Sequence, residues 1–259
     1  MASAVGHAGK TGRKARHAAL GLAMPVPPCP IAVPALTGLI AARLPARQPA
    51  VIGLTGSVAA GKSTLATALA AAFPVASNVA VVGTDAWLLP NAELEARGLA
   101  LKKGFPESFD AAALAALPAA LRAGPVTIPG YSHRVYDVDP ALARRIDPPD
   151  VLILEGLGFV GPGIADQVDL LVYLDAEPDD LEHWFLARFM AYWHAAADDP
   201  ASFYARFRSM TEPEAEAFGR MVWATINRPN LDNHIIQARE TAHIVVRKAR
   251  DHSLTLLRA

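Results

Sequence analysis

The segment Gly56-Ser-Val-Ala-Ala-Gly-Lys62-Ser63 decides how the rest of this chain is interpreted, because it matches the pattern G-x-x-x-x-G-K-[ST]. A short apolar run, residues 51–55, precedes the match, and a run rich in Ala and Leu, residues 64–73, follows it. A strand, a glycine-rich loop and a helix in this order form a P-loop, whose backbone N–H groups and helix dipole bind phosphate. A chance match in a chain rich in Ala and Gly is the alternative, and the flanking runs argue against it.

The loop predicts how the phosphates of ATP are bound. Lys62 is expected to reach the β- and γ-phosphates, and the Ser63 hydroxyl is expected to bind Mg²⁺. Glycine is required at positions 56 and 61 because a Cβ atom would crowd the phosphates or strain the loop backbone. The predicted ATP-binding residues of this segment are Gly56, Ser57, Val58, Ala59, Ala60, Gly61, Lys62, Ser63 and Thr64.

The length and composition indicate a soluble α/β domain, and the length allows an appended subdomain. The chain has 259 residues, and a hydrophobic fraction of 52% is sufficient for a full core. No apolar run reaches the roughly 18 residues that a membrane span needs, so no membrane partner is expected. Cys29 is the single cysteine, which excludes an intrachain disulfide and favours a reducing, cytoplasmic compartment.

Charge is distributed unevenly along the chain. Residues 1–84 contain seven basic and no acidic residues, whereas residues 85–259 contain 17 basic and 25 acidic ones. We predict a disordered basic, Pro-rich tail over residues 1–35, and a targeting segment or a true start at Met24 are the alternatives. Residues 24–34 carry five prolines, which excludes a helix and indicates a linker. One domain over residues 36–259 follows, and its acidic balance argues against a nucleic-acid partner.

Five runs of strand-like composition punctuate the chain, and several are apolar throughout rather than alternating. Such runs are typical of strands buried on both faces, as in a parallel sheet. Helical stretches separate them, so we predict an α/β, P-loop NTPase-like, doubly wound fold with a mainly parallel five-stranded sheet and helices on both faces. The predicted strands are residues 50–55, 79–84, 151–155, 170–175 and 243–247, and the predicted helices are residues 64–73, 110–123, 179–196 and 212–225.

Acidic residues follow three of the predicted strands, at the edge where ligands collect in such folds. An acid after a strand often only caps the next helix. We assign that structural role to Asp175, because three further acids crowd the same turn. Asp85 and Glu155 are predicted to be functional, because a P-loop needs Mg²⁺ and an acid that orients the nucleophile.

Two segments after the second strand resemble signature segments of the type I bacterial pantothenate kinases. They are Lys103-Gly-Phe-Pro-Glu-Ser-Phe-Asp110 and Tyr131-Ser-His-Arg-Val-Tyr-Asp137. A P-loop alone is typical of a superfamily, whereas these two segments are specific to this branch. With further matches in order and spacing, the resemblance covers most of residues 50–259. Those matches include Thr84-Asp85, Leu89-Pro-Asn91, Val151-Leu-Ile-Leu-Glu155, Arg188-Phe189, Ile226-Asn227 and Asp251-His252-Ser253.

The resemblance implies transfer of the γ-phosphate of ATP, with Mg²⁺, to the primary hydroxyl of pantothenate, the first step toward coenzyme A. Asp85 would orient the hydroxyl or accept its proton, and Lys62 and Arg188 would stabilise charge on the transferring group. Glu155 would lie on the metal side of the site, and His252 resembles the residue that flanks adenine. The residues that match the pantothenate-binding positions are Tyr131, His133, Tyr136, Phe185 and Asn227.

The chain departs from the family pattern at four places. Residues 1–49 show no clear counterpart of the helical segment that precedes the P-loop and helps to enclose adenine. Phe185 stands where a tyrosine that contacts substrate is common. Thr67 replaces an arginine linked to feedback inhibition by coenzyme A, so we expect weak feedback. Ala86 follows the catalytic acid in place of glycine, and alanine tolerates a positive φ poorly.

Other functions stay open at this point. One is a P-loop kinase of the uridine or sugar kinase branch, which would use the same phosphate-binding parts with a different hydroxylated acceptor. Another is a degenerate kinase that binds nucleotide without turnover, although the reactive residues are all of the required chemical type. Trp184 and Phe189 are predicted to be core residues of the long helix, and a homodimer is possible.

Overall fold

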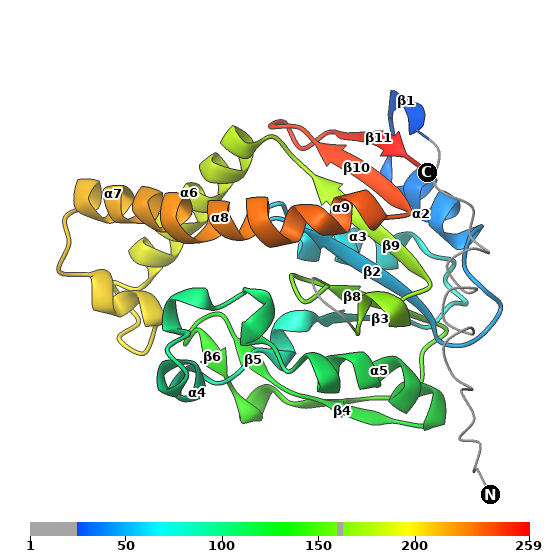
Figure 1. The fold of residues 1–259 in the computed structure, drawn as a ribbon, viewed down its shortest axis with the longest axis horizontal. Helices are drawn as coiled ribbons and strands as arrows, with labels where there is room; N and C mark the ends of the chain where they lie inside the picture. The colour runs from blue at the N-terminus through cyan, green and yellow to red at the C-terminus, as the bar shows by residue number, and fades with distance from the viewer. Residues whose placement is uncertain (1–24, 160–162) are drawn as a thin grey trace, which may run out of the picture.

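The computed structural model describes residues 25–159 and 163–259. Its main feature is a seven-stranded sheet with the strand order β1-β11-β10-β9-β2-β8-β3 (Figure 1). The strands from β10 to β3 run parallel, and β11 and β1 are antiparallel additions at one edge. The strands are β1 (Pro25–Pro30), β2 (Ala50–Gly56), β3 (Val79–Gly83), β8 (Val151–Glu155), β9 (Leu170–Asp175), β10 (Ile244–Lys248) and β11 (Leu254–Arg258).

The five parallel strands confirm the predicted strands, and every predicted run lies within one residue of an observed strand. The sheet has seven strands and not the predicted five, because β1 and β11 add to one edge. Strands β2 and β9 are buried along their whole length, and β8 is buried except at its last residue. This burial explains why their sequences are apolar throughout instead of alternating. The register pairs Leu54 with Glu155 and Gly56 with Leu174, so the strand ends meet at one edge of the sheet.

The segment before β2 differs from the prediction. The sequence indicates a linker at Pro25–Pro30, but these residues form β1, which pairs with β11. Prolines are tolerated there because the outer side of an edge strand needs no N–H donors. The helix α2 (Val33–Ala41) packs on the helix that follows the P-loop, so a helix does precede the loop. The rest of the predicted tail, residues 1–24, lies outside the described residues.

Helices cover both faces of the sheet. Helix α3 packs against β2, β3 and β8, and α9 packs against β2 and β9. Figure 1 shows α8 and α9 passing in front of the strands, with α3 behind them. The helices after α2 are α3 (Lys62–Ala72), α4 (Asn91–Ala96), α5 (Ala111–Ala123), α6 (Pro178–Ala195), α7 (Glu212–Val222), α8 (Arg228–Asn230) and α9 (Ile236–Thr241). The π-helical segments η7 (Trp223–Asn227) and η8 (Leu231–Ile235) join α7, α8 and α9 into one long helix.

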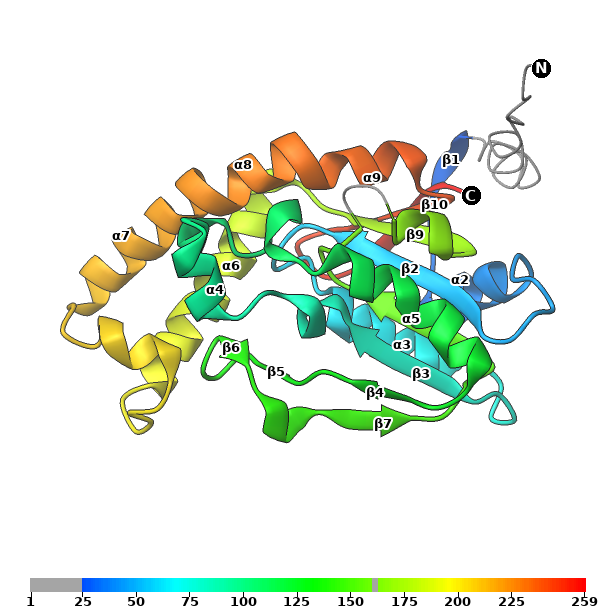
Figure 2. The ribbon, with the colours of Figure 1, turned by 60° about the horizontal axis from the view of Figure 1, so that its bottom comes forward.

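An arm formed by α6, η6 (Phe203–Phe207) and α7 projects from the sheet, at the left of Figures 1 and 2. It has a small apolar core of its own, in which Phe189 and Trp193 are buried against the rings of Phe207 and Phe218. Two short antiparallel pairs lie beside the β3 edge of the sheet, below it in Figures 1 and 2. They are β4 (Val126–Ile128) with β7 (Arg144–Ile146) and β5 (Tyr131–Ser132) with β6 (Asp137–Val138). Across the described residues, none of the helices has the length and apolar character that crossing a membrane requires.

Short 3-10 turns connect these elements. The turn that matters for function is η1 (Thr84–Trp87), which follows β3 directly. Besides η6 in the arm, the other 3-10 turns that the structure describes are η2 (Ala100–Lys102), η3 (Pro106–Ser108), η4 (Pro140–Leu142) and η5 (Ala165–Gln167).

Candidate active site

The P-loop lies between the end of β2 and the start of α3. Three of its residues have a positive φ, which is 148° at Gly56, 65° at Ala59 and 93° at Gly61. A Cβ atom on Gly56 would lie 2.3 Å from the carbonyl oxygen of Leu174, so only glycine fits there. Backbone in such left-handed conformations turns successive N–H groups toward one side and, with the N-terminus of a helix, forms an anion-binding nest. The loop therefore has the shape that phosphate binding requires.

Lys62 and Ser63 are the first two residues of α3. The Nζ of Lys62 donates a hydrogen bond to the carbonyl of Ser57 across the loop, at 2.8 Å. The Ser63 hydroxyl donates to Oε1 of Glu155 at the end of β8, also at 2.8 Å. Burial lowers the pKa of Lys62 to about 8, although Glu155 and Asp85 oppose this effect. The structure thus brings the predicted cation, hydroxyl and carboxylate together.

Asp85 lies near the P-loop because the end of β3 is close to the end of β8. It lies in η1, and the register places the end of β3 beside Glu155. Gly156 has a φ of 147°, and a Cβ atom on it would lie 1.9 Å from Oγ1 of Thr84. The glycine after Glu155 therefore lets η1 pack against the end of β8. Ala86 belongs to the same turn and is not among the described residues with a positive φ, which agrees with the poor tolerance of alanine for that conformation.

The carboxylate of Asp85 lies between the P-loop and the segment that resembles an acceptor-binding motif. Its side chain is 34% exposed, and its Oδ2 atom is 3.8 Å from Nε2 of His133. Its charge raises the pKa of Lys62 and of Lys103, although burial has the larger and opposite effect on both. Asp85 also raises the pKa of Tyr131, after burial, which is the main cause. The acid is therefore close enough to act on groups of both halves of the site.

Tyr131, His133 and Tyr136 lie on the short hairpin formed by β5 and β6. Tyr136 has a φ of 55°, which places it in the tight turn between the two strands. The ring of Tyr131 is 5.2 Å from the ring of His133 and 6.4 Å from that of Tyr136, between centroids. These three predicted acceptor residues therefore form one aromatic cluster.

Lys103 lies at the centre of the hairpin contacts, and sequence reasoning assigned it no role. Its side chain is only 5% exposed. Its Nζ donates to the carbonyl of Tyr136 and to Oδ1 of Asn91, at 2.6 Å each. The same atom lies 5.1 Å and 4.6 Å from the ring centroids of Tyr131 and Tyr136. Burial lowers the pKa of Lys103 to about 8. The available signal was its position at the start of a signature segment.

Arg188 approaches the P-loop from α6 in the arm. Its side chain is exposed, and its charge lowers the pKa of Lys62 and of Tyr136, in both cases as a minor contribution beside burial. Because Arg188 acts electrostatically on Lys62 and on Tyr136, it lies near both the P-loop and the hairpin formed by β5 and β6, which we call the acceptor hairpin after its predicted role. The predicted catalytic residues Asp85, Lys62 and Arg188 thus gather in one place.

The other two predicted acceptor residues have different surroundings. Phe185 is 9% exposed, and its ring packs against those of Phe189 and Trp223, so it belongs to the apolar core. Asn227 ends η7 and is half-buried. One turn later, the buried Asn230 donates a hydrogen bond from Nδ2 to the carbonyl of Gly104, at 3.0 Å. This hydrogen bond joins the long helix to the signature segment that begins at Lys103.

His252 lies in the turn between β10 and β11 with a φ of 68°. Its imidazole stacks on the indole of Trp184, with centroids 5.4 Å apart and an interplanar angle of 25°. Trp184 is half-buried and packs against the main hydrophobic core, so the predicted core position is confirmed in part. Phe189 is 5% exposed, as predicted for a core residue.

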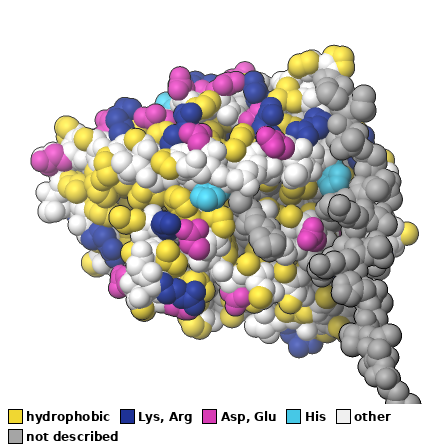
Figure 3. Space-filling view, viewed as in Figure 1, with side chains coloured by type: hydrophobic (Ala, Val, Ile, Leu, Met, Phe, Trp, Pro, Cys, Tyr) yellow, Lys and Arg dark blue, Asp and Glu magenta, His cyan; other side chains and the backbone are white. Residues whose placement is uncertain are grey.

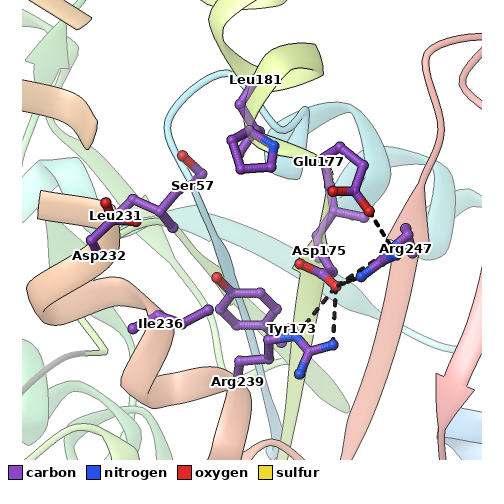
Figure 4. Close-up of a pocket in the computed structure, with 13 residues that line it drawn as sticks. Ser57, Tyr173, Asp175, Glu177, Leu181, Leu231, Asp232, Ile236, Arg239 and Arg247 are labelled. Carbon is purple, nitrogen blue, oxygen red and sulfur yellow. Dashed lines mark hydrogen bonds and ion pairs between the residues drawn. The ribbon is translucent and has the colours of Figure 1, made fainter. Parts of the chain in front are cut away.

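A cavity of about 240 Å³ lies at the end of β9, beside Ser57 of the P-loop (Figure 4). Figure 4 shows Asp175 accepting hydrogen bonds through Oδ2 from Arg239 and Arg247, at 3.1–3.3 Å. Asp175 is therefore structural, but it forms ion pairs and does not cap α6. The N-cap residue of α6 is Glu177, which forms no side-chain cap.

Two oxygen atoms at the P-loop could hold a divalent cation. Within the described part of the chain, no group of three His, Cys, Asp or Glu residues could hold a metal ion without a further partner. A kinase site does not need one, because Mg²⁺ takes phosphate oxygens of the nucleotide together with a hydroxyl and one or two carboxylates. The hydroxyl of Ser63 and the carboxylate of Glu155, 2.8 Å apart, suit such a site.

We expect kcat/KM for ATP to fall as the pH rises through about 8, the pKa of Lys62. This ratio reports the free enzyme, in which Lys62 loses its charge above that pH and no longer attracts phosphate. Bound phosphates favour the charged form of the lysine, so the decline in kcat at saturating ATP should begin at a higher pH. Steady-state kinetics across about pH 6 to 10 measure both profiles, and a flat kcat/KM over this range would contradict the prediction.

The protein belongs to the class of P-loop phosphotransferases. This class is defined by three features of the site, which are the P-loop, the carboxylate beside it and the acceptor hairpin. Comparison with protein families agrees with this class. The model of the family described as Phosphoribulokinase / Uridine kinase matches residues 51–192. The chain belongs to this family.

Curated relatives match over most of the chain. A pantothenate kinase from Streptomyces avermitilis is 43% identical over 225 residues, which cover 81% of this chain and 68% of that protein. A pantothenate kinase from Rhizobium rhizogenes is 41% identical over 223 residues, which cover 80% of this chain and 67% of that protein.

Solved structures share the fold. A proposed kinase of a fructose transport system from Silicibacter sp. TM1040 has a TM-score of 0.62 at 26% identity and covers 82% of this chain and 95% of its own. D-glycerate 3-kinase from Cryptococcus neoformans has a TM-score of 0.56 at 13% identity and covers 85% of this chain and 96% of its own. The second likeness concerns the fold alone.

Proposed function

We propose that this protein is an ATP-dependent pantothenate kinase, which transfers the γ-phosphate of ATP to the primary hydroxyl of pantothenate. The curated relatives above carry this name and match four-fifths of the chain. The observation that carries the proposal is the meeting of two distant signature segments, one beginning at Lys103 and one at Tyr131, beside Asp85 and the P-loop.

In the proposed reaction, Asp85 accepts the proton of the acceptor hydroxyl. The hydroxyl oxygen then forms a bond to the γ-phosphorus while the bond from that phosphorus to the β–γ bridging oxygen breaks, and ADP leaves. Phosphoryl transfer depends mostly on positioning and on neutralisation of charge, which Lys62 and Arg188 supply on the phosphate side. Mg²⁺ bound at Ser63 and Glu155 would neutralise further phosphate charge.

The acceptor side suits a small polar anion. Pantothenate has an amide, two hydroxyls and a carboxylate, and a site for it needs several neutral donors and one apolar wall. The hydroxyls of Tyr131 and Tyr136, the His133 ring and the Asn227 amide supply the donors. The arm supplies the wall, because Phe203 packs on Tyr136 with ring centroids 4.7 Å apart. Figure 3 shows hydrophobic side chains gathering on this face beside the arm.

A kinase of the uridine or sugar kinase branch is the alternative, because the matching family includes uridine kinases. The phosphate-binding parts would be the same, so only the acceptor separates the two proposals. ATP consumption by the purified protein with Mg²⁺ should therefore be measured with pantothenate, uridine and simple sugars, with Lys62→Ala as the inactive control. Pantothenate should be turned over most efficiently. Faster turnover of uridine or a sugar would replace the proposal, and no turnover with any acceptor would favour a kinase that only binds nucleotide.

Replacement of Lys103 by methionine is expected to raise KM for pantothenate about tenfold and to change kcat less. The substitution leaves the Asn91 amide oxygen without its donor, and the Tyr136 carbonyl keeps only the hydrogen bond from Nδ2 of Asn91. An unpaired buried acceptor costs about 1–3 kcal/mol, which is enough to displace the hairpin. Lys102→Met, at a side chain that is 52% exposed, is the matched control. An unchanged KM would show that Lys103 does not support the acceptor site.

A further inference from the structure

Three contacts join the start of α6 to the end of β10 and the turn that follows it. Lys248, the last residue of β10, places its Nζ atom 3.7 Å from the ring centroid of Trp184. His252 stacks on the same indole, with centroids 5.4 Å apart. One turn earlier on α6, Asp180 accepts a hydrogen bond from Nε of Arg250, at 2.6 Å. The first turns of α6 are therefore held by the hairpin of β10 and β11.

Lys248 also lies against the P-loop. A Cβ atom on Gly61 would be 3.0 Å from its Nζ. Burial lowers the pKa of Lys248, although Asp180 opposes the effect. Among the described residues Lys248 forms no ion pair, and its charge is stabilised by the face of the Trp184 ring and, electrostatically, by Asp180. Trp184 is thus linked through one lysine to the backbone that would hold phosphate.

Arg188 follows Trp184 by one helical turn, and the two side chains share a face of α6. Lys248 contacts both the Trp184 ring and Gly61, so the turn of α6 that leads from Trp184 to Arg188 starts near the P-loop, and the charge of Arg188 lowers the pKa of Lys62. In the part of the chain that the structure describes, the Arg188 side chain forms no hydrogen bond or ion pair. Its position is therefore set by the orientation of α6 and not by a contact of its own.

We propose that Trp184 is a positioning residue for phosphoryl transfer. Clamped by Lys248 and His252, it fixes the orientation of α6 and so holds Arg188 at the P-loop. The inference rests on the proposed role of Arg188 in stabilising the transferring phosphate. Displacement of a catalytic group by about 1 Å costs on the order of 10²-fold in rate, whereas the nest that binds ATP would be unaffected.

A double-mutant cycle tests this proposal. Trp184→Leu should lower kcat at least about tenfold and change KM for ATP by less than about twofold, because a positioning defect acts on the transition state. Arg188→Ala should lower kcat further. The double variant should be no slower than Arg188→Ala alone, because Trp184 acts through the arginine that is already missing. His183→Leu is the matched control, since this exposed neighbour lies on a different face of α6 and should leave kcat unchanged.

Two results would overturn the proposal. Multiplicative losses in the double variant would show that Trp184 acts independently of Arg188. A raised KM for ATP with an unchanged kcat would show that the indole contacts the nucleotide instead. Thermal unfolding checks that each variant is folded. If Trp184→Leu is not folded, Lys248→Met replaces it in the double-mutant cycle. This variant keeps the indole ring and removes the ammonium that contacts it.

The proposal that pantothenate is the acceptor can be wrong while the proposed role of Trp184 is correct. If the wild-type protein transfers no phosphate to pantothenate, the proposed acceptor is wrong, and the cycle is measured on ATP hydrolysis, in which water replaces the alcohol at the same P-loop. Non-additive losses there would still support the role of Trp184, and multiplicative losses would contradict it.

Discussion

Asparagine in place of Asp85 is expected to lower kcat by about 10³-fold, because proton transfer to a positioned side chain contributes 10²- to 10⁴-fold. The amide keeps the size and shape of the carboxylate but cannot accept the hydroxyl proton. The structure places this carboxylate 3.8 Å from His133 and within electrostatic reach of Lys62. KM for ATP should change little, since the P-loop itself is unaltered. Steady-state kinetics at saturating ATP and pantothenate measure the loss.

Asp147→Asn is the control for this substitution, because the Asp147 side chain is 79% exposed and lies outside the site. It should leave kcat unchanged. An Asp85→Asn variant with wild-type kcat would mean that the proton leaves by another route, and the assignment of the acid would be wrong. A loss confined to KM for pantothenate would give Asp85 a binding role alone.

Methionine in place of Lys62 is expected to lower kcat/KM for ATP by about 10³-fold. Removal of one preorganised group that stabilises transition-state charge costs on the order of 10² to 10³ in kcat, and the loss of phosphate attraction adds to it. Methionine retains most of the length and apolar body of the side chain, so α3 should be preserved. Kinetics as a function of ATP concentration separate the two contributions, and the dissociation constant of a fluorescent ATP analogue measures the binding part.

Lys102→Met also serves as the control here, because its ammonium pairs with Glu107 on the surface. A Lys62→Met variant with normal kcat/KM would exclude the P-loop lysine from phosphate binding. The pH dependence described above provides a second check, because the decline in kcat/KM that we assign to Lys62 should disappear in this variant.

The five parallel strands of the sheet were predictable, and the antiparallel strands β1 and β11 were not. The parallel strands are apolar throughout because helices cover both faces, and such runs are visible in a sequence. The residues Pro25–Pro30 carry prolines, which argue against a strand in general. They form one at the sheet edge because only one side of an edge strand must donate hydrogen bonds. Whether a segment lies at an edge depends on the order of all the strands in the sheet. A local sequence pattern carries no information about that order.

The candidate site was predictable as separate groups, but its arrangement was not. Motif and strand-end position indicate Lys62, Asp85 and Glu155, and the structure brings them together. The contact of Trp184 with Lys248 was not predictable, because helical periodicity does not show that one face of a partly buried ring meets a residue of another element. Lys103 was not assigned a role, because its burial depends on a hairpin that lies about 30 residues away.

By itself, the sequence determined the backbone of the P-loop and the end of β8, because the glycines at positions 56, 61 and 156 accept angles or close approaches that a Cβ atom would prevent. It also determined the parallel sheet through its apolar runs. Only the tertiary structure decided which side chains meet at the ends of those strands. Desolvation lowers the pKa of Lys103, and the Trp184 ring meets the Lys248 ammonium, only when distant segments are packed together.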